Sequence, residues 1–164
     1  GSAMTVYTTT ASPLGELMLV GEPRPAGAAL TALSIAGGKG GGAQPDWIED
    51  RAPFASVIDQ LDGYFAGQRT RFELDYAVEG SEFRRRVWQA LDDIPYGRTV
   101  TYGDIAARVG APRAAVRAVG SAIGANPVLI VRPCHRVIGA NGRLTGYAGG
   151  IDRKRQLLEL EHAA

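Results

Sequence analysis

The chain has a single cysteine, Cys134, and only two histidines among its 164 residues. One cysteine excludes an internal disulfide, so a reducing cytoplasm is the expected compartment. One cysteine and two histidines are also too few for a zinc site, and we expect no metal. No apolar run reaches the roughly 20 residues that a membrane helix needs, so no membrane association is expected.

Targeting segments and nucleotide-binding motifs are lacking as well. Residues 1–4 (Gly-Ser-Ala-Met) resemble a cloning remnant before the native methionine, and Thr8 and Ser12 interrupt any apolar stretch of a signal peptide. The glycine-rich residues 37–42 lack the Gly-Lys-Ser/Thr ending of a phosphate-binding loop and predict a flexible loop. No glycine motif for a dinucleotide or S-adenosylmethionine is present, so we expect no cofactor and no external methyl donor.

Charge is distributed unevenly along the chain, although the formal net charge is only +1. Residues 1–80 hold 5 Lys/Arg against 10 Asp/Glu, whereas residues 81–164 hold 13 against 7. A strongly basic half points to nucleic acid as a partner. We therefore predict an N-terminal domain over residues 5–80 and a DNA-binding domain over residues 81–164.

The apolar periodicity predicts an α/β (α+β) chain whose strands lie in the first half. The expected strands of the first half cover residues 6–9, 17–20, 30–35 and 72–76, and its helix covers residues 54–65. The expected helices of the second half cover residues 81–91, 101–109 and 113–124, and a final helix includes residues 157–161. A turn at residues 110–112 makes the middle pair either a helix-turn-helix or a plain helical hairpin.

The stretch Pro-Cys-His-Arg-Val at residues 133–137 carries the chemical signal. A thiol becomes a nucleophile as its thiolate, and a neighbouring cation or base favours that form. Cys134 is followed by His135 and Arg136, whereas a lone cysteine is more often a small buried apolar residue. Adjacent side chains generally point apart, so a water or a third group would have to relay the proton.

This motif resembles the active-site signature of the O6-alkylguanine-DNA alkyltransferases, also called methylated-DNA–protein-cysteine methyltransferases. The resemblance covers residues 81–161 and extends, in order, over Phe83…Val87-Trp88, Ile94-Pro95-Tyr96-Gly97, Thr101-Tyr102-Gly103, Arg117-Ala118-Val119-Gly120, Asn126-Pro127 and Leu144-Thr145-Gly146-Tyr147-Ala148-Gly149-Gly150. It implies an N-terminal ribonuclease-H-like domain with an antiparallel sheet and a helix, followed by a mostly helical domain with a helix-turn-helix.

The resemblance implies a catalytic role for each of five residues. Cys134 would attack the alkyl carbon, with His135 acting through a water as its base and Glu161 orienting the imidazole. Asn126 would stabilise the turn that carries the cysteine. Tyr102 would donate a proton or hydrogen bond to guanine N3 as the base leaves. The product is a thioether, so a single turnover is expected.

The resemblance also implies duplex DNA containing O6-alkylguanine as the partner of a monomeric protein. The target base would be flipped out of the stack from the minor groove, and an arginine matching Arg117 would take its place. The expected DNA-binding residues are Arg117, Tyr102, Ala118, Gly120 and Ser121. The expected base-binding residues are Val137, Gly146, Tyr147, Ala148 and Gly149.

The sequence departs from the family pattern at a few positions. The stretch from Gly110 to Arg117 is one residue longer than the usual family turn, and Val116 stands where alanine commonly precedes the arginine. This difference could shift the start of the second helix. Arg132 stands where the family often has an apolar residue, and it would reach either a phosphate or solvent. Ala148 replaces a serine of some members and leaves only a backbone contact.

Three other functions are compatible with parts of the sequence. A non-catalytic relative would bind alkylated DNA without repairing it, but such relatives replace the cysteine, commonly with tryptophan, and Cys134 argues against this. A helix-turn-helix regulator could use Cys134 as a redox sensor, but this leaves Asn126 and Tyr147 unexplained. A cysteine hydrolase is disfavoured because no other suitably placed histidine is present.

Overall fold

The computed structural model describes residues 4–39 and 42–162. The chain divides into two compact units, Gly1–Glu79 and Gly80–Ala164, and each is described by itself. Within the described ranges, no helix is long and apolar enough to cross a membrane. Residues 1–3 of the expected cloning remnant lie outside these ranges, as do residues 40–41 of the expected glycine-rich loop.

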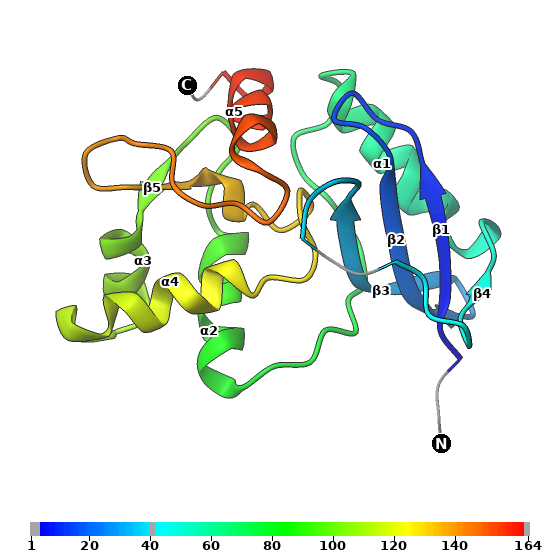
Figure 1. Ribbon diagram of the computed structural model, residues 1–164, viewed down its shortest axis with the longest axis horizontal. Coiled ribbons are helices and arrows are strands. Elements are labelled where there is room, and N and C mark those ends of the chain that lie inside the picture. The colour runs from blue at the N-terminus through cyan, green and yellow to red at the C-terminus, as the bar shows by residue number, and fades with distance from the viewer. Residues whose placement is uncertain (1–3, 40–41, 163–164) are drawn as a thin grey trace. The chain divides into compact units, whose positions relative to one another are not determined.

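A four-stranded sheet forms the first unit (Figure 1). Its strands, in chain order, are β1 (Val6–Thr10), β2 (Leu17–Arg24), β3 (Gly27–Ile35) and β4 (Ile48–Glu49). Their order in the sheet is β3-β2-β1-β4, with β1–β2 and β2–β3 antiparallel and β1–β4 parallel. The sheet bulges between Val20 and Gly21, where a side chain on Gly21 would clash with the Ala29 carbonyl. The predicted strands 6–9, 17–20 and 30–35 are confirmed, and β4 was not predicted because two residues carry no periodicity.

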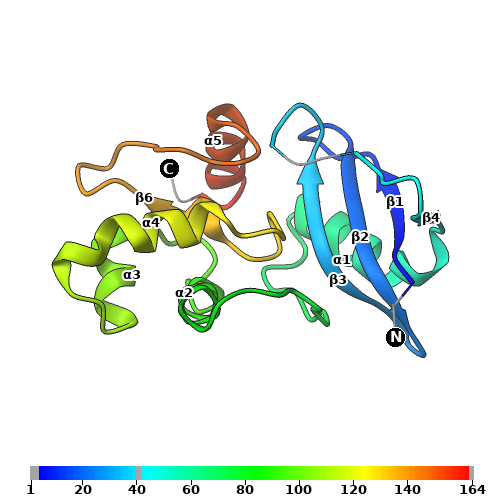
Figure 2. The same ribbon diagram turned by 60° about the horizontal axis from the view of Figure 1, so that its bottom comes forward.

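One helix completes the core of the first unit. A 3-10 turn, η1 (Ala52–Phe54), packs on β2 and β3 and continues into α1 (Ala55–Phe65), which lies along the sheet (Figures 1 and 2). The predicted helix 54–65 is therefore confirmed. The predicted strand 72–76 is wrong: it makes one isolated bridge, between Tyr76 and Leu30, and is otherwise irregular. Its alternation reflects a segment that lies beside β3 with too few ladder bonds to form a strand.

Short helices make up most of the second unit. They are α2 (Glu82–Asp92), α3 (Tyr102–Arg108), the 3-10 turn η2 (Arg113–Ala115), α4 (Val116–Gly124), the 3-10 turn η3 (Cys134–Arg136) and α5 (Ile151–Leu160). Ser81 caps α2, and Thr101 forms a capping box with Asp104 at the start of α3. Two-residue strands β5 (Val100–Thr101) and β6 (Val137–Ile138) pair in parallel. All four predicted helices are present.

Helices α3 and α4 lie side by side and both pack on α2 (Figure 2). Together with the turn between them, these two helices form the predicted helix-turn-helix. Val87 and Leu91 of α2 are buried, and the indole Nε1 of Trp88 donates to the carbonyl of Ala122 in α4, at 2.9 Å. The apolar residues 128–131 are all buried, so the segment that leads to Cys134 runs through the core of the unit.

Candidate active site

Cys134 begins the 3-10 turn η3, directly after the buried segment 128–131. The residue is 6% exposed, and its amide donates to the carbonyl of Arg132 at 2.8 Å. Burial raises the pKa of the thiol. A hydrogen bond from Asn126 and the charges of Lys154 and Arg132 act in the opposite direction. The resting thiol is therefore protonated at neutral pH and needs a base to become a nucleophile.

Asn126 holds the segment in front of the cysteine. Its buried side-chain Nδ2 donates to the carbonyls of Val128, at 3.2 Å, and Arg132, at 3.3 Å. Its Oδ1 accepts from the amide of Val128 at 3.1 Å. One side chain thus satisfies backbone groups at both ends of a stretch that has no ladder of its own, which is the role expected for Asn126.

His135 pairs with Glu161 in the interior of the unit. The Nε2 of His135 lies 2.7 Å from Glu161 Oε2, and both side chains are fully buried. Burial lowers the pKa of His135, so the imidazole is neutral near pH 7, with Nε2–H donating to the carboxylate. Its Nδ1 is buried and has no hydrogen-bond partner among the described residues. An acceptor nitrogen is therefore available within the site.

Arg136 clamps Glu161 from the other side. Its Nε and Nη2 donate to the two carboxylate oxygens at 2.7 and 3.0 Å, and its Nη1 donates to the carbonyl of Ile94 at 2.6 Å. The guanidinium also lies over the ring of Tyr96, 5.7 Å from its centroid. Arg136 therefore supports the orienting carboxylate rather than the neighbouring thiol. The sequence suggested it only as a cation beside Cys134.

Lys154 is a site residue that sequence reasoning missed. It is 1% exposed, and its Nζ donates to the carbonyls of Val137, at 2.7 Å, and Thr145, at 2.9 Å. Burial lowers its pKa to about 8. A signal existed, because Lys154 lies three, four and seven residues before Leu157, Leu158 and Glu161, on the buried face of α5.

The expected base-binding residues lie next to the two carbonyls that Lys154 binds: Val137 carries one of them, and residues 146–149 directly follow Thr145, which carries the other. Val137 is fully buried, whereas Gly146 is exposed and Ala148 half-buried. The ring of Tyr147 lies edge-on to that of His135, with centroids 6.4 Å apart. Burial raises the pKa of Tyr147 well above its usual range, so its buried hydroxyl keeps the proton.

The first residue of α3 contacts the same loop. Tyr102 shares a hydrogen bond of 2.7 Å with the hydroxyl of Thr145, and it lies against Gly120 of α4. The fold thus joins Tyr102 to the loop that carries the expected base-binding residues 146–149 and to the second helix of the helix-turn-helix. Thr145 matches the family motif, but nothing in the sequence pointed to this contact.

The outer face of α4 presents most of the expected DNA-binding residues. Arg117, Ala118 and Ser121 are exposed, Gly120 is half-buried, and the opposite face buries Val119 with two other residues of the helix. The 3-10 turn η2 precedes this helix, and α4 begins at residue 116. Arg117 consequently lies in the first turn of the helix.

Arg132 was expected to reach either a phosphate or solvent, and the structure shows neither. The side chain is buried, so it neither extends into solvent nor reaches outward to a phosphate. Its Nε donates to Asp92 Oδ1 at 3.2 Å, and its guanidinium lies 5.4 Å from the centroid of the Trp88 ring.

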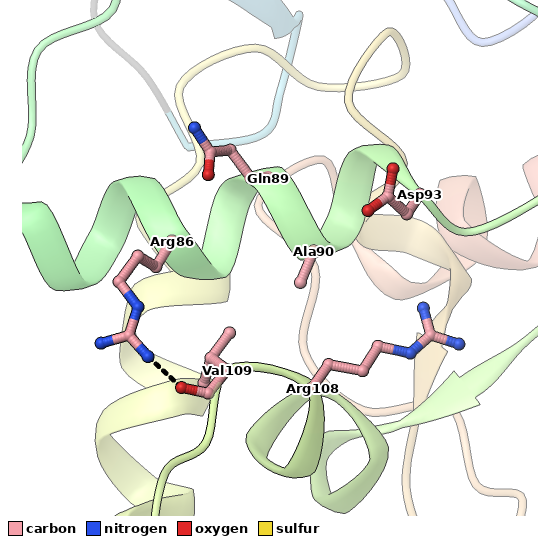
Figure 3. A pocket seen from close by; sticks show the side chains of 6 residues that line it. All are labelled: Arg86, Gln89, Ala90, Asp93, Arg108 and Val109. Carbon is pink, nitrogen blue, oxygen red and sulfur yellow. Dashed lines mark hydrogen bonds between the residues drawn. The ribbon is translucent and has the colours of Figure 1, made fainter.

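A pocket of about 360 Å³ opens on the second unit between α2 and α3 (Figure 3). Its lining residues are Arg86, Gln89, Ala90, Asp93, Arg108 and Val109. Figure 3 shows Arg86 reaching across to donate to the carbonyl of Val109, just past the end of α3. None of the expected site residues lines this pocket, which is therefore separate from the thiol site.

Comparison with known proteins agrees with this arrangement. Residues 82–163 match the DNA-binding domain of 6-O-methylguanine DNA methyltransferase, and residues 5–77 match its ribonuclease-like domain. A methylated-DNA–protein-cysteine methyltransferase of Mycolicibacterium paratuberculosis is 51% identical over 158 residues, covering 96% of this chain and 93% of the relative.

Solved structures show the same fold. The O6-methylguanine methyltransferase of Mycobacterium tuberculosis is 49% identical, with a TM-score of 0.87 over 98% of this chain and 94% of its own. The Mycobacterium tuberculosis OGT in complex with DNA is 48% identical, with a TM-score of 0.85 over 96% and 93%. The chain therefore belongs to the 6-O-methylguanine DNA methyltransferase family. The predicted α+β fold with a ribonuclease-like first half is confirmed.

Proposed function

We propose that this protein repairs O6-alkylguanine in duplex DNA, chiefly O6-methylguanine, by transferring the alkyl group to Cys134. One observation carries the proposal: the only cysteine lies on a buried turn next to a neutral His135 that a buried glutamate orients. This is the nucleophile–base–orienter arrangement of covalent catalysis, with a thiol in place of a hydroxyl.

The reaction follows from the protonation states of these groups. His135 Nδ1 accepts the thiol proton through a water, and the sulfur of Cys134 attacks the alkyl carbon. The new S–C bond forms as the bond between that carbon and O6 breaks, and the electron pair stays on guanine. Tyr102 donates a proton or hydrogen bond to N3 of the leaving base, which neutralises the developing charge. Asn126 keeps the thiol's turn in place.

Access to the alkyl group requires base flipping, since a base stacked in the duplex cannot reach the buried thiol of Cys134. The outer face of α4 enters the minor groove through Ala118, Gly120 and Ser121, and Arg117 occupies the place of the flipped nucleotide. Groups around Val137 and the Tyr147 loop hold the base, with the backbone at Gly146, Ala148 and Gly149 reading its edge. Minor-groove binding suits a lesion that arises in any sequence.

Each molecule acts once and as a monomer. A thioether has no easily displaced leaving group, so Cys134 is consumed by one lesion. The cytoplasm is the proposed location because the thiol must stay reduced. A redox-sensor function is disfavoured, since sensor cysteines are exposed and have a low pKa, whereas Cys134 is buried and its pKa is raised.

The transfer is tested by incubating the protein with a duplex oligonucleotide that contains O6-methylguanine. The peptide with Cys134 should gain the mass of one methyl group, and Cys134→Ser should gain none. With lesion in excess, the repaired amount should plateau at one equivalent of protein. An unmodified peptide with the lesion intact would contradict transfer, and repair beyond one equivalent would contradict single turnover.

Base flipping is tested separately through Arg117. Arg117→Ala should slow transfer from duplex DNA by about 10-fold or more, because unstacking costs a few kcal/mol and the arginine compensates for it. Reaction with free O6-methylguanine base should stay within about twofold, since no stack is opened. Arg113→Ala, an exposed arginine in the turn before α4, is the matched control. Equal losses on duplex and free base would rule out the flipping role.

A further inference from the structure

A buried guanidinium lies two residues before the nucleophile. Arginine is almost never fully buried unless it is paired, because desolvation of its charge is costly. Arg132 meets this requirement with two groups of α2, the carboxylate of Asp92 and the ring of Trp88. Trp88 in turn donates to a backbone carbonyl of α4. The side chain thus joins the cysteine's segment to α2 and, through the indole, to the helix that faces DNA in the proposed function.

The backbone of Arg132 is connected to the thiol equally directly. Its carbonyl accepts from the amide of Cys134 at 2.8 Å and from the side chain of Asn126 at 3.3 Å. A displacement of Arg132 therefore moves the residue that carries the sulfur. Asn126 holds the carbonyl, and the Arg132 side chain ties this point to α2.

The segment needs such an anchor because its backbone is strained. Ile130 has φ of +70°, a left-handed conformation that a β-branched residue rarely adopts. Strain of this kind persists only where surrounding contacts determine the conformation, and it concentrates at functional sites. Asn126 and Arg132 hold the segment on either side of Ile130.

The charge of Arg132 has a second effect. Together with Lys154, it lowers the pKa of Cys134 against the effect of burial. An arginine that served only to fill the core would be replaceable by an apolar residue with no effect on the thiol.

We propose that Arg132 is a positioning residue for Cys134: held between Asp92 and Trp88, it fixes the segment that carries the thiol and keeps a positive charge near the sulfur. The inference concerns the same thiol as the proposed function. Its test uses a thiol reagent without DNA, so failure of one can be distinguished from failure of the other.

The test is the pH dependence of Cys134 alkylation by iodoacetamide, measured on the full chain. Because the protein has one cysteine, the reagent reports on this thiol alone. Arg132→Met should move the midpoint of this pH profile to higher pH and slow alkylation about threefold near pH 8. The substitution removes a positive charge that favours the thiolate. Arg132→Lys should restore most of the shift. Asp92→Asn, which removes the counter-charge and keeps the guanidinium, should move the midpoint to lower pH.

Arg155→Met, at an exposed arginine of α5, is the control and should behave as wild type. Circular dichroism checks that each variant is folded, and the Lys and Asn variants keep the test valid if the Met variant unfolds. Opposite shifts for Arg132→Met and Asp92→Asn support the proposal, because a purely structural role does not reverse sign. Midpoints equal to wild type in the folded variants would overturn it.

Discussion

Burial and charge act against each other on the thiol of Cys134. Burial keeps the sulfur protonated, while Lys154, Arg132 and the amide of Asn126 favour the thiolate. The result is a thiol that stays protonated at rest, and in the proposed function His135 activates it. If each molecule reacts only once, as in the proposed function, a protected resting thiol limits loss to unrelated electrophiles.

Burial also changes the titration of Lys154. Its folded pKa of about 8 lies below its usual value of 10.5, so between these values the unfolded chain binds a proton that the folded chain has released. The free energy of unfolding therefore rises with pH across this window, and the destabilising effect is fully present below it. Its two hydrogen bonds, to the carbonyls of Val137 and Thr145, offset part of this cost.

We predict that Lys154→Met removes this pH dependence. In a Cys134→Ser background, which eliminates the thiol titration, the parent should gain about 1–2 kcal/mol between about pH 7.5 and 9.5 relative to the Met variant. Urea denaturation at the two pH values measures the difference. Lys39→Met, at an exposed lysine of the first unit, should leave the dependence unchanged. Parallel pH profiles for parent and Lys154→Met would refute the assignment.

At the scale of elements, α3 is the least self-sufficient helix of the proposed site. It has only seven residues, too short to be stable alone, yet it begins with Tyr102 and packs against α4. Thr101 and Asp104 cap its first turn, and Arg86 of α2 donates to the carbonyl of Val109 at the other end. A cation at a helix C-terminus also interacts favourably with the helix dipole.

Arg86→Ala should therefore lower the free energy of unfolding by about 1–2 kcal/mol, because it removes a charge-assisted hydrogen bond at the end of α3. Chemical denaturation of the whole protein measures the loss. Arg85→Ala is the matched control, at an exposed neighbour on the same helix, and should change stability by less than about 0.5 kcal/mol. Equal effects of the two substitutions would show that Arg86 is not a cap.

Over the whole molecule, the change from net negative to net positive charge falls at the division between the two structural units. The structural division falls after Glu79, and the residues from 81 onward carry 13 Lys/Arg against 7 Asp/Glu. The half that contains the helix-turn-helix thus carries the positive charge, and the sheet-containing half is acidic. We therefore expect attraction to the phosphate backbone to come from the second unit and to be independent of the lesion.

Affinity for a lesion-free duplex should accordingly fall about 10-fold or more between about 50 and 200 mM salt, because phosphate contacts release condensed counterions. Fluorescence anisotropy with a labelled duplex measures it. Arg117→Gln should reduce the slope of log affinity against log salt, whereas Arg71→Gln in the acidic half should leave the slope unchanged. A flat salt dependence would be inconsistent with electrostatic binding by the second unit.

Local patterns in the sequence were sufficient for most elements. Apolar periodicity located α1, α2 and α5, and Ser81 and Thr101 marked helix starts that the structure bears out as caps. The same reasoning failed for residues 72–76 and for β4, β5 and β6, because an isolated bridge or a two-residue strand depends on a partner distant in the chain. The uniqueness of Cys134 and its motif needed no structure at all.

The partners of the site residues were decided by tertiary structure alone. His135 and Arg136 are adjacent to Cys134, yet both turn to Glu161, about 25 residues away in the chain. The cations that favour the thiolate are instead Lys154, which the sequence did not single out, and Arg132, for which it predicted a solvent or phosphate contact. Sequence determines which groups exist and how local structure spaces them. Burial and long-range packing determine which groups meet, because the free energy of a charge depends on what replaces its water.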